Sequence, residues 1–127
     1  SFAGGASLRP SQVASLVEQS TGARPGRSDL RPWEPVEILQ RILANVRAWA
    51  NRPERLSTRR WAIERALLLP RHPLDLRRQH GMVLVQLGGF AEGAEALEQY
   101  ANLVEPTDAQ AADKTRALAR KARSRLN

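Results

Sequence analysis

The sequence predicts an all-α protein made of antiparallel helical hairpins. Apolar residues recur at helical spacing along nearly the whole chain, and no segment keeps the alternation of a strand for long. Prolines and glycines stand between these segments, at positions suited to the starts and ends of helices. The 127 residues, 42% of them hydrophobic and none of them cysteine, can form one compact core without disulfide support.

The N-terminal segment, residues 1–34, is expected to contain one short helix and one loop. The helix would begin after Pro10 with Ser11 as its N-cap. Its short apolar stripe would consist of Val13, Leu16 and Val17. Residues 23–34 hold prolines, a glycine and alternating charges, which is typical of a loop. A helix of about ten residues is marginal in water by itself, so the stripe needs a surface to cover.

Residues 35–127 are expected to form the helical domain, which begins with a first hairpin. Pro35 suits the first turn of its first helix, and Asn51-Arg52-Pro53 ends that helix. The apolar face of this helix would be Ile38, Leu39, Ile42, Leu43, Val46 and Trp49. The partner helix runs to about Leu69, where Pro70 closes it. Its inward residues would be Leu56, Ile63, Ala66 and Leu67.

A second hairpin and a final helix complete the predicted domain. The hairpin joins a helix over about 74–87 to one over about 90–104 through a tight turn at Gly88-Gly89. The inward residues would be Leu76, Val83, Leu84 and Leu87, then Phe90, Ala94, Leu97, Tyr100 and Ala101. Thr107-Asp108-Ala109-Gln110 matches a capping box that would start the final helix.

The two hairpins are related by an internal repeat. Its period is about 34 residues, which is the length of a helix–turn–helix unit of the tetratricopeptide type. Sliding the chain by this period places Leu56 on Phe90. It also places Ile63 on Leu97, and both pairs are large apolar residues on the second helix of a hairpin. The pattern therefore predicts a tetratricopeptide-like, right-handed stack of hairpins with a C-terminal capping helix.

The second copy of the repeat has the clearer signature. Gly81 and Gly93 are small at the point where its two helices would approach closely. Arg47 and Arg59 occupy the corresponding positions of the first copy, which is therefore degenerate. Two repeats with a cap are few for a solenoid, since about three repeats are normally needed for stability.

Three stretches of the chain resemble one family. They are residues 38–47 (ILQRILANVR), the Leu67-Leu68-Leu69-Pro70 end of the first hairpin, and residues 81–88 (GMVLVQLG). These stretches are similar to the C-terminal, tetratricopeptide-like half of bacterial transglutaminase-like proteins of the SirB type. The opening Phe2-Ala3-Gly4-Gly5 resembles the segment in which the papain-like half of that family ends. The resemblance implies that the catalytic cysteine, histidine and aspartate lie upstream, so no catalytic residue is carried over to this chain.

The net charge of +7 is divided into blocks of alternating sign. Residues 41–78 carry +7, residues 79–113 carry −6, and residues 114–127 carry +6. The basic blocks leave open an alternative function, non-specific binding of nucleic acid or another polyanion, which would weaken steeply with salt. Alternation instead favours helices that complement one another's charge, and the three tryptophans are too scattered for a base-stacking platform. Nucleic acid is therefore a disfavoured partner.

No residue pattern in the sequence indicates a catalytic, cofactor or metal site. His72 and His80 are eight residues apart, which is not the i, i+4 spacing of helical metal ligands. Glu92, Glu95 and Glu98 are typical of a solvated helix face or of partners for arginines. No serine has a histidine and a carboxylate at a suggestive spacing, so the chain alone is expected to show no hydrolase or transamidase activity. An enzyme is the least supported class of function.

The arginines indicate a protein-binding surface instead. In the repeat register, the first helices of the hairpins form the inner, concave face of the stack. The predicted concave face consists of Arg41, Ala44, Asn45, Ala48, Arg78, Met82 and Val85. Guanidinium groups there could bind the carboxylate of a peptide C-terminus or of an acidic segment. The opposing interpretation is that the arginines pair with carboxylates of the same chain, namely Glu92, Glu95, Glu98 and Glu105.

Together these observations predict a non-catalytic, helical-repeat protein-interaction module without a cofactor. The expected partner is a protein, either the upstream domain that the resemblance implies or an acidic, carboxylate-bearing peptide. If the surface that the apolar stripe over residues 11–22 would cover belongs to the upstream domain, we also expect the chain to self-associate through that stripe. The sequence has no apolar run as long as a membrane span and no segment typical of a signal peptide, so we expect a cytoplasmic location without a membrane partner.

Overall fold

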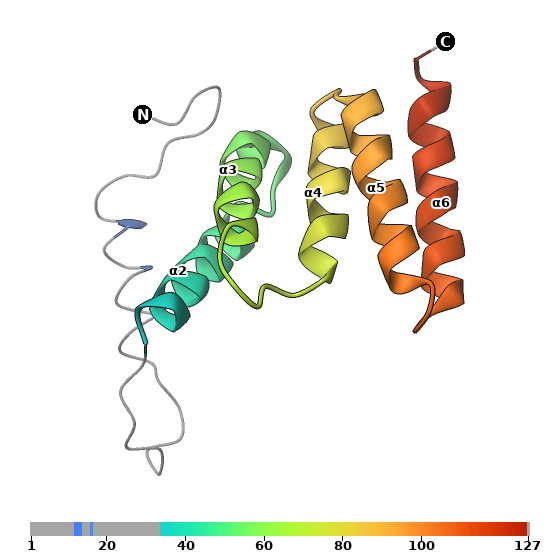
Figure 1. Ribbon diagram of the computed structural model, residues 1–127. Coiled ribbons are helices and arrows are strands. Elements are labelled where there is room, and N and C mark those ends of the chain that lie inside the picture. The colour runs from blue at the N-terminus through green and yellow to red at the C-terminus, as the bar shows by residue number, and fades with distance from the viewer. Residues whose placement is uncertain (1–11, 14–15, 17–33, 127) are drawn as a thin grey trace. The chain divides into compact units, whose positions relative to one another are not determined.

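The computed structural model of the protein describes residues 12, 13, 16 and 34–126 (Figure 1). Every regular element among these residues is helical, which confirms the all-α prediction. The chain divides into two compact units, residues 1–70 and residues 71–127. The division at residue 35 expected from the sequence stays a prediction.

Part of the predicted N-terminal helix lies among the described residues. Gln12, Val13 and Leu16 are helical. Leu16 is buried, whereas Val13 is 40% exposed. The predicted stripe is thus buried at Leu16 and exposed at Val13. Val17 lies outside the described residues, and so does the expected loop over 23–34 except for Glu34.

The first unit contains a helical hairpin, formed by α2 (Pro35–Trp49) and α3 (Leu56–Leu67) and joined through the 3-10 turn η1 (Pro53–Arg55). Pro35 occupies the start of α2 as predicted, because its missing N–H would have no partner there. The Glu34 backbone N–H donates to the Glu37 carboxylate at 2.9 Å, which fixes the first turn. The two helices pack against each other, and their buried residues are Leu43, Val46, Thr58, Ala62, Ile63 and Ala66.

The predicted apolar face of α2 is wrong at Leu39, which is 48% exposed. Leu39 is on the same side of the helix as Leu43 but one turn nearer the open end of the hairpin. Ile38, Ile42 and Trp49 of the predicted face are half-buried, as are Leu56 and Leu67 of α3.

The second unit consists of α4 (Asp75–Gln86), α5 (Phe90–Val104) and α6 (Ala109–Ser124). Helix α5 contacts both α4 and α6, and the three helices lie side by side (Figure 1). Leu97 is fully buried at the centre of this unit, in a cluster with Ala94, Ala119 and Ala122. Leu87 was expected inside but is 39% exposed, because it follows the last residue of α4.

Helices α4 and α5 approach each other closely through two glycines, as the repeat predicted. A Cβ at Gly93 would lie 2.9 Å from the Gly81 carbonyl oxygen. A Cβ at Gly81 would lie 2.8 Å from the Leu97 side chain. Gly88 makes the turn between the helices with φ of 92°, a left-handed conformation that favours glycine. Small residues are therefore required on both sides of this contact.

The first hairpin replaces the glycine contact by an arginine. Arg47 and Arg59 stand one repeat period before Gly81 and Gly93 in the sequence. In the first unit the Arg59 guanidinium donates to the Arg47 carbonyl oxygen at 2.8 Å. That carbonyl is the counterpart of the Gly81 carbonyl that meets Gly93. The degenerate copy thus keeps the repeat register, with a side-chain hydrogen bond where the second copy has close backbone packing.

Helix α6 begins one residue later than the predicted capping box implies. Asp108 is the N-cap, and its carboxylate accepts a hydrogen bond from the Ala111 N–H at 3.0 Å. The Thr107 hydroxyl instead donates to the Val104 carbonyl oxygen at the end of α5. An aspartate caps a helix at least as well as a threonine, and its charge also favours the helix N-terminus.

Replacing Asp108 by alanine is expected to lower the free energy of unfolding by about 1 kcal/mol, because the Ala111 N–H loses its partner. Urea denaturation followed by circular dichroism measures the change. Asp113→Ala, which removes an exposed carboxylate from the same helix, is the matched control and should change stability by less than about 0.5 kcal/mol. Equal effects of the two substitutions would contradict the capping role.

Candidate functional site

The predicted concave face has one part in each unit. In the first unit, Arg41, Ala44, Asn45 and Ala48 follow one stripe of α2 at helical spacing. Arg41 and Ala48 are exposed, and the two residues between them are half-buried. The structure thus places this half of the predicted site along one face of α2.

In the second unit, Arg78, Met82 and Val85 lie on α4. The Arg78 guanidinium donates to both carboxylate oxygens of Asp75, at 2.6 and 3.2 Å. This pair lowers the pKa of Asp75 and raises that of Arg78. A ligand carboxylate at Arg78 must therefore compete with Asp75, a pairing that the sequence pattern does not predict. A single site combining the α2 and α4 parts stays a prediction.

Met82 and Val85 border an apolar cavity of about 190 Å³ in the second unit. Both side chains are half-buried and pack against the Leu97 cluster. All three helices of the unit contribute to the cavity. Its lining residues are Met82, Val85, Phe90, Leu97, Leu118, Lys121, Ala122 and Arg125. We call this cavity the α4–α6 pocket.

The contribution of α6 to the α4–α6 pocket was missed from the sequence. The predicted face took residues only from the first helix of each hairpin and ended at Val85. The spacing between Pro70 and Pro106, which is slightly longer than the repeat period, is the feature of the sequence that would have indicated this contribution. The same shift places Met82 on Leu118 and brings α6 into the position of a further first helix.

Four of the cations on α6 and at its C-cap fall into two groups. Arg123 donates to both oxygens of Glu98, at 2.9 and 2.7 Å, and Arg116 binds Glu105 at 2.7 Å. By contrast, none of the described carboxylates pairs with Lys121 or with Arg125, whose guanidinium carbon lies 4.9 Å from the centre of the Phe90 ring. The cations directed at α5 are thus neutralised, and those at the α4–α6 pocket are not.

The ion pairs lower the pKa values of the carboxyl groups that they contain. Hydrogen bonds from Arg123 lower the pKa of Glu98, and Arg116 does the same for Glu105. A lowered pKa means that the Glu98 pair stabilises the fold above the ordinary value of 4.5 and stops doing so as the pH falls through the lowered pKa. Both pairs are partly exposed, so each contributes little and salt screens it.

Several arginines of the basic block hold the first hairpin together. The Arg55 guanidinium donates to the Trp49 carbonyl oxygen at 2.8 Å and lies 3.9 Å from the centre of the indole ring. Like Arg59, it supplies a donor to a carbonyl at the C-terminal end of α2, where positive charge is favourable. The alternative that arginines of the predicted concave face pair with Glu98 and Glu105 is wrong, since these carboxylates pair with Arg123 and Arg116 of α6. Arg78 does pair with a carboxylate of the same chain, that of Asp75.

The remaining candidate residues are His72, His80, Glu92 and Glu95. His72 and His80 are half-buried, and Glu92 and Glu95 are exposed on α5. Within residues 12, 13, 16 and 34–126, no three metal-ligating side chains come together. None of the helices described in the structure is long and apolar enough to cross a membrane.

A hairpin closed by paired glycines, a matching arginine-bridged hairpin and a further helix define the chain as a helical-repeat protein. The tetratricopeptide repeat family profile matches residues 46–127, about two thirds of the chain, and the chain belongs to this family. Such repeats generally mediate protein–protein interaction and are generally non-catalytic. No curated protein and no solved structure matched the chain.

Proposed function

We propose that this chain is a non-catalytic module that binds a protein partner on the first-helix faces of its repeats. The observation that carries the proposal is the α4–α6 pocket, an apolar cavity with two cations that lack a carboxylate partner among the described residues. An apolar centre with a polar rim is the usual anatomy of a protein-binding site. Membership of the tetratricopeptide repeat family supports this class of function.

The partner we propose is a papain-like, transglutaminase-type domain of the SirB family in the bacterial cytoplasm. The resemblance of residues 38–47 and 81–88 to the C-terminal half of such proteins supports this choice. The two halves would then form one functional unit, with catalysis in the papain-like half and binding or positioning in the repeats.

Isothermal titration of the chain with a separately produced SirB-type catalytic domain tests the proposal. We expect saturable binding that weakens as salt is raised, because cations at the α4–α6 pocket contribute to it. Hydrogen exchange of the complex should show protection on α4 and α6 relative to the free chain. Absence of binding at high micromolar concentration would overturn the choice of partner. Sedimentation of the chain alone separates this result from self-association.

A further inference from the structure

We infer that the α4–α6 pocket receives one large apolar side chain that is flanked by carboxylates, within an acidic segment of the partner. This inference rests on the proposed function and specifies the chemistry of the segment that is bound. Two independent features of the pocket carry it, its size and the arrangement of its charges.

The size of the α4–α6 pocket suits one side chain. An apolar protein cavity of about 150 Å³ is large enough to bind benzene. At about 190 Å³, this cavity can therefore hold the side chain of a phenylalanine or a leucine. Its lining is apolar apart from the two cations, so a side chain that donates hydrogen bonds would find no side-chain acceptor there, and one that accepts them would find side-chain donors only at Lys121 and Arg125.

The charges of the α4–α6 pocket select carboxylates next to that side chain. Lys121 and Arg125 are four residues apart at the C-terminal end of α6, so they lie on one face and repel each other. An incoming carboxylate relieves this repulsion and supplies both cations with a partner. On the same helix, Arg116 and Arg123 already have carboxylate partners and are not available to a ligand in this way.

An internal acidic segment fits this arrangement better than a chain terminus. The two cations are spaced along α6 by one helical turn, so they can meet carboxylates on both sides of an inserted side chain. The carboxylate of a chain terminus lies on one side of the last side chain only, so a terminus would need a further acidic residue before it to supply both cations. The segment we propose therefore has the pattern acidic–apolar–acidic, with the apolar residue in the cavity.

The single methionine of the chain provides a direct readout. Met82 lines the α4–α6 pocket, so a chain labelled with ¹³C at the methionine methyl gives one signal from the site. The probe is the acetylated and amidated peptide Gly-Glu-Phe-Glu-Gly. The matched peptides replace both Glu by Gln, or Phe by Ala. We expect the Glu–Phe–Glu peptide to shift this signal at concentrations about three- to tenfold lower than either matched peptide.

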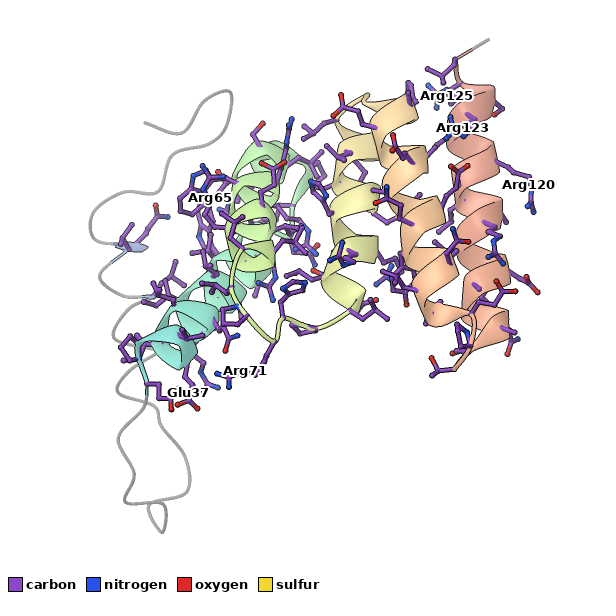
Figure 2. The ribbon with its side chains drawn as sticks, in the orientation of Figure 1. Glu37, Arg65, Arg71, Arg120, Arg123 and Arg125 are labelled. Atoms are coloured by element: carbon purple, nitrogen blue, oxygen red, sulfur yellow. The ribbon has the colours of Figure 1, made fainter. Side chains whose placement is uncertain are left out.

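Variants of the protein test the same interaction between the peptide carboxylates and the two cations of the α4–α6 pocket. In Lys121→Gln/Arg125→Gln, the preference for the Glu peptide over the Gln peptide should disappear, since charge removal on either side breaks the same interaction. Arg120→Gln removes a positive charge from the same helix, at a residue directed away from the other two helices (Figure 2), and should keep the preference. Leu118→Ala should weaken binding of the Phe peptides, whereas the exposed Leu103→Ala should not.

Three outcomes would overturn the inference. The first is equal binding of the Glu and Gln peptides, and the second is an equal loss of preference in Arg120→Gln and in the double variant. The third is tighter binding of acetyl-Gly-Gln-Phe with a free carboxyl terminus, which would favour a chain terminus as the ligand. If the peptides fail while the SirB-type domain binds, the inference falls and the proposed function stands. If the peptides bind and the domain does not, the proposed partner is wrong.

Discussion

Replacing Leu97 by alanine is expected to lower the free energy of unfolding of the second unit by about 2–5 kcal/mol, the range for a fully buried leucine. The side chain is the centre of the cluster of α4, α5 and α6, and it covers Gly81. Because a glycine has no side chain that could move into the space, the cavity cannot collapse easily. The loss should therefore be near the upper end of the range.

Urea denaturation and native-state hydrogen exchange of the α5 amides measure the effect of Leu97→Ala. Leu103→Ala is the matched control on the same helix, because Leu103 is 51% exposed, and we expect a change of less than about 0.5 kcal/mol. A Gly81→Ala substitution added to Leu97→Ala should restore part of the stability, since the new methyl enters space that Leu97 occupied. A loss below about 1 kcal/mol for Leu97→Ala would contradict the central role of this residue.

Replacing Gly93 by alanine is expected to cost about 1–3 kcal/mol of stability, although alanine is the better helix former by about 1 kcal/mol. The added methyl would lie 2.5 Å from the Val85 Cγ2 and 2.9 Å from the Gly81 carbonyl oxygen. The valine side chain can rotate, but the carbonyl belongs to the backbone of α4. The two helices must therefore move apart, which outweighs the gain in helix propensity.

Thermal denaturation of Gly93→Ala, Val85→Ala and the double variant separates the two contacts. If the Gly81 carbonyl is the decisive contact, Gly93→Ala/Val85→Ala should be at least as unstable as the sum of the two single effects predicts. Recovery of stability in the double variant would show that the contact with the Val85 side chain causes most of the destabilisation. A Gly93→Ala protein more stable than the parent would contradict the close approach of α4 and α5.

The helix boundaries of the second unit could be predicted from the sequence because local chemistry sets them. The Gly88-Gly89 turn, the glutamate–proline pair at Glu105-Pro106 and the apolar spacing between them gave Phe90–Val104, the bounds that α5 has. Pro35 likewise marked the start of α2. Each of these signals acts within a few residues, through a missing N–H or a left-handed φ.

The repeat also made one tertiary feature predictable. Gly81 and Gly93 were identified as a close contact from their place in the repeat, and the structure confirms it. The repeat period does not predict how Arg47 and Arg59 are accommodated at the same positions of the first copy. That solution needs a guanidinium to reach a particular carbonyl across the hairpin, which depends on the distance between two helices.

The sequence by itself determined the helices, their order and the repeat that relates them, because these follow from spacing and from turn residues along the chain. Only the tertiary structure decided which charges remain for a partner. Glu98 and Glu105 pair with Arg123 and Arg116, which leaves Lys121 and Arg125 at the α4–α6 pocket. The sequence alone does not distinguish one arginine or lysine from another as the partner of a carboxylate. Which cations are neutralised depends on contacts between residues far apart in the chain, such as Glu98 and Arg123, which are separated by 25 residues.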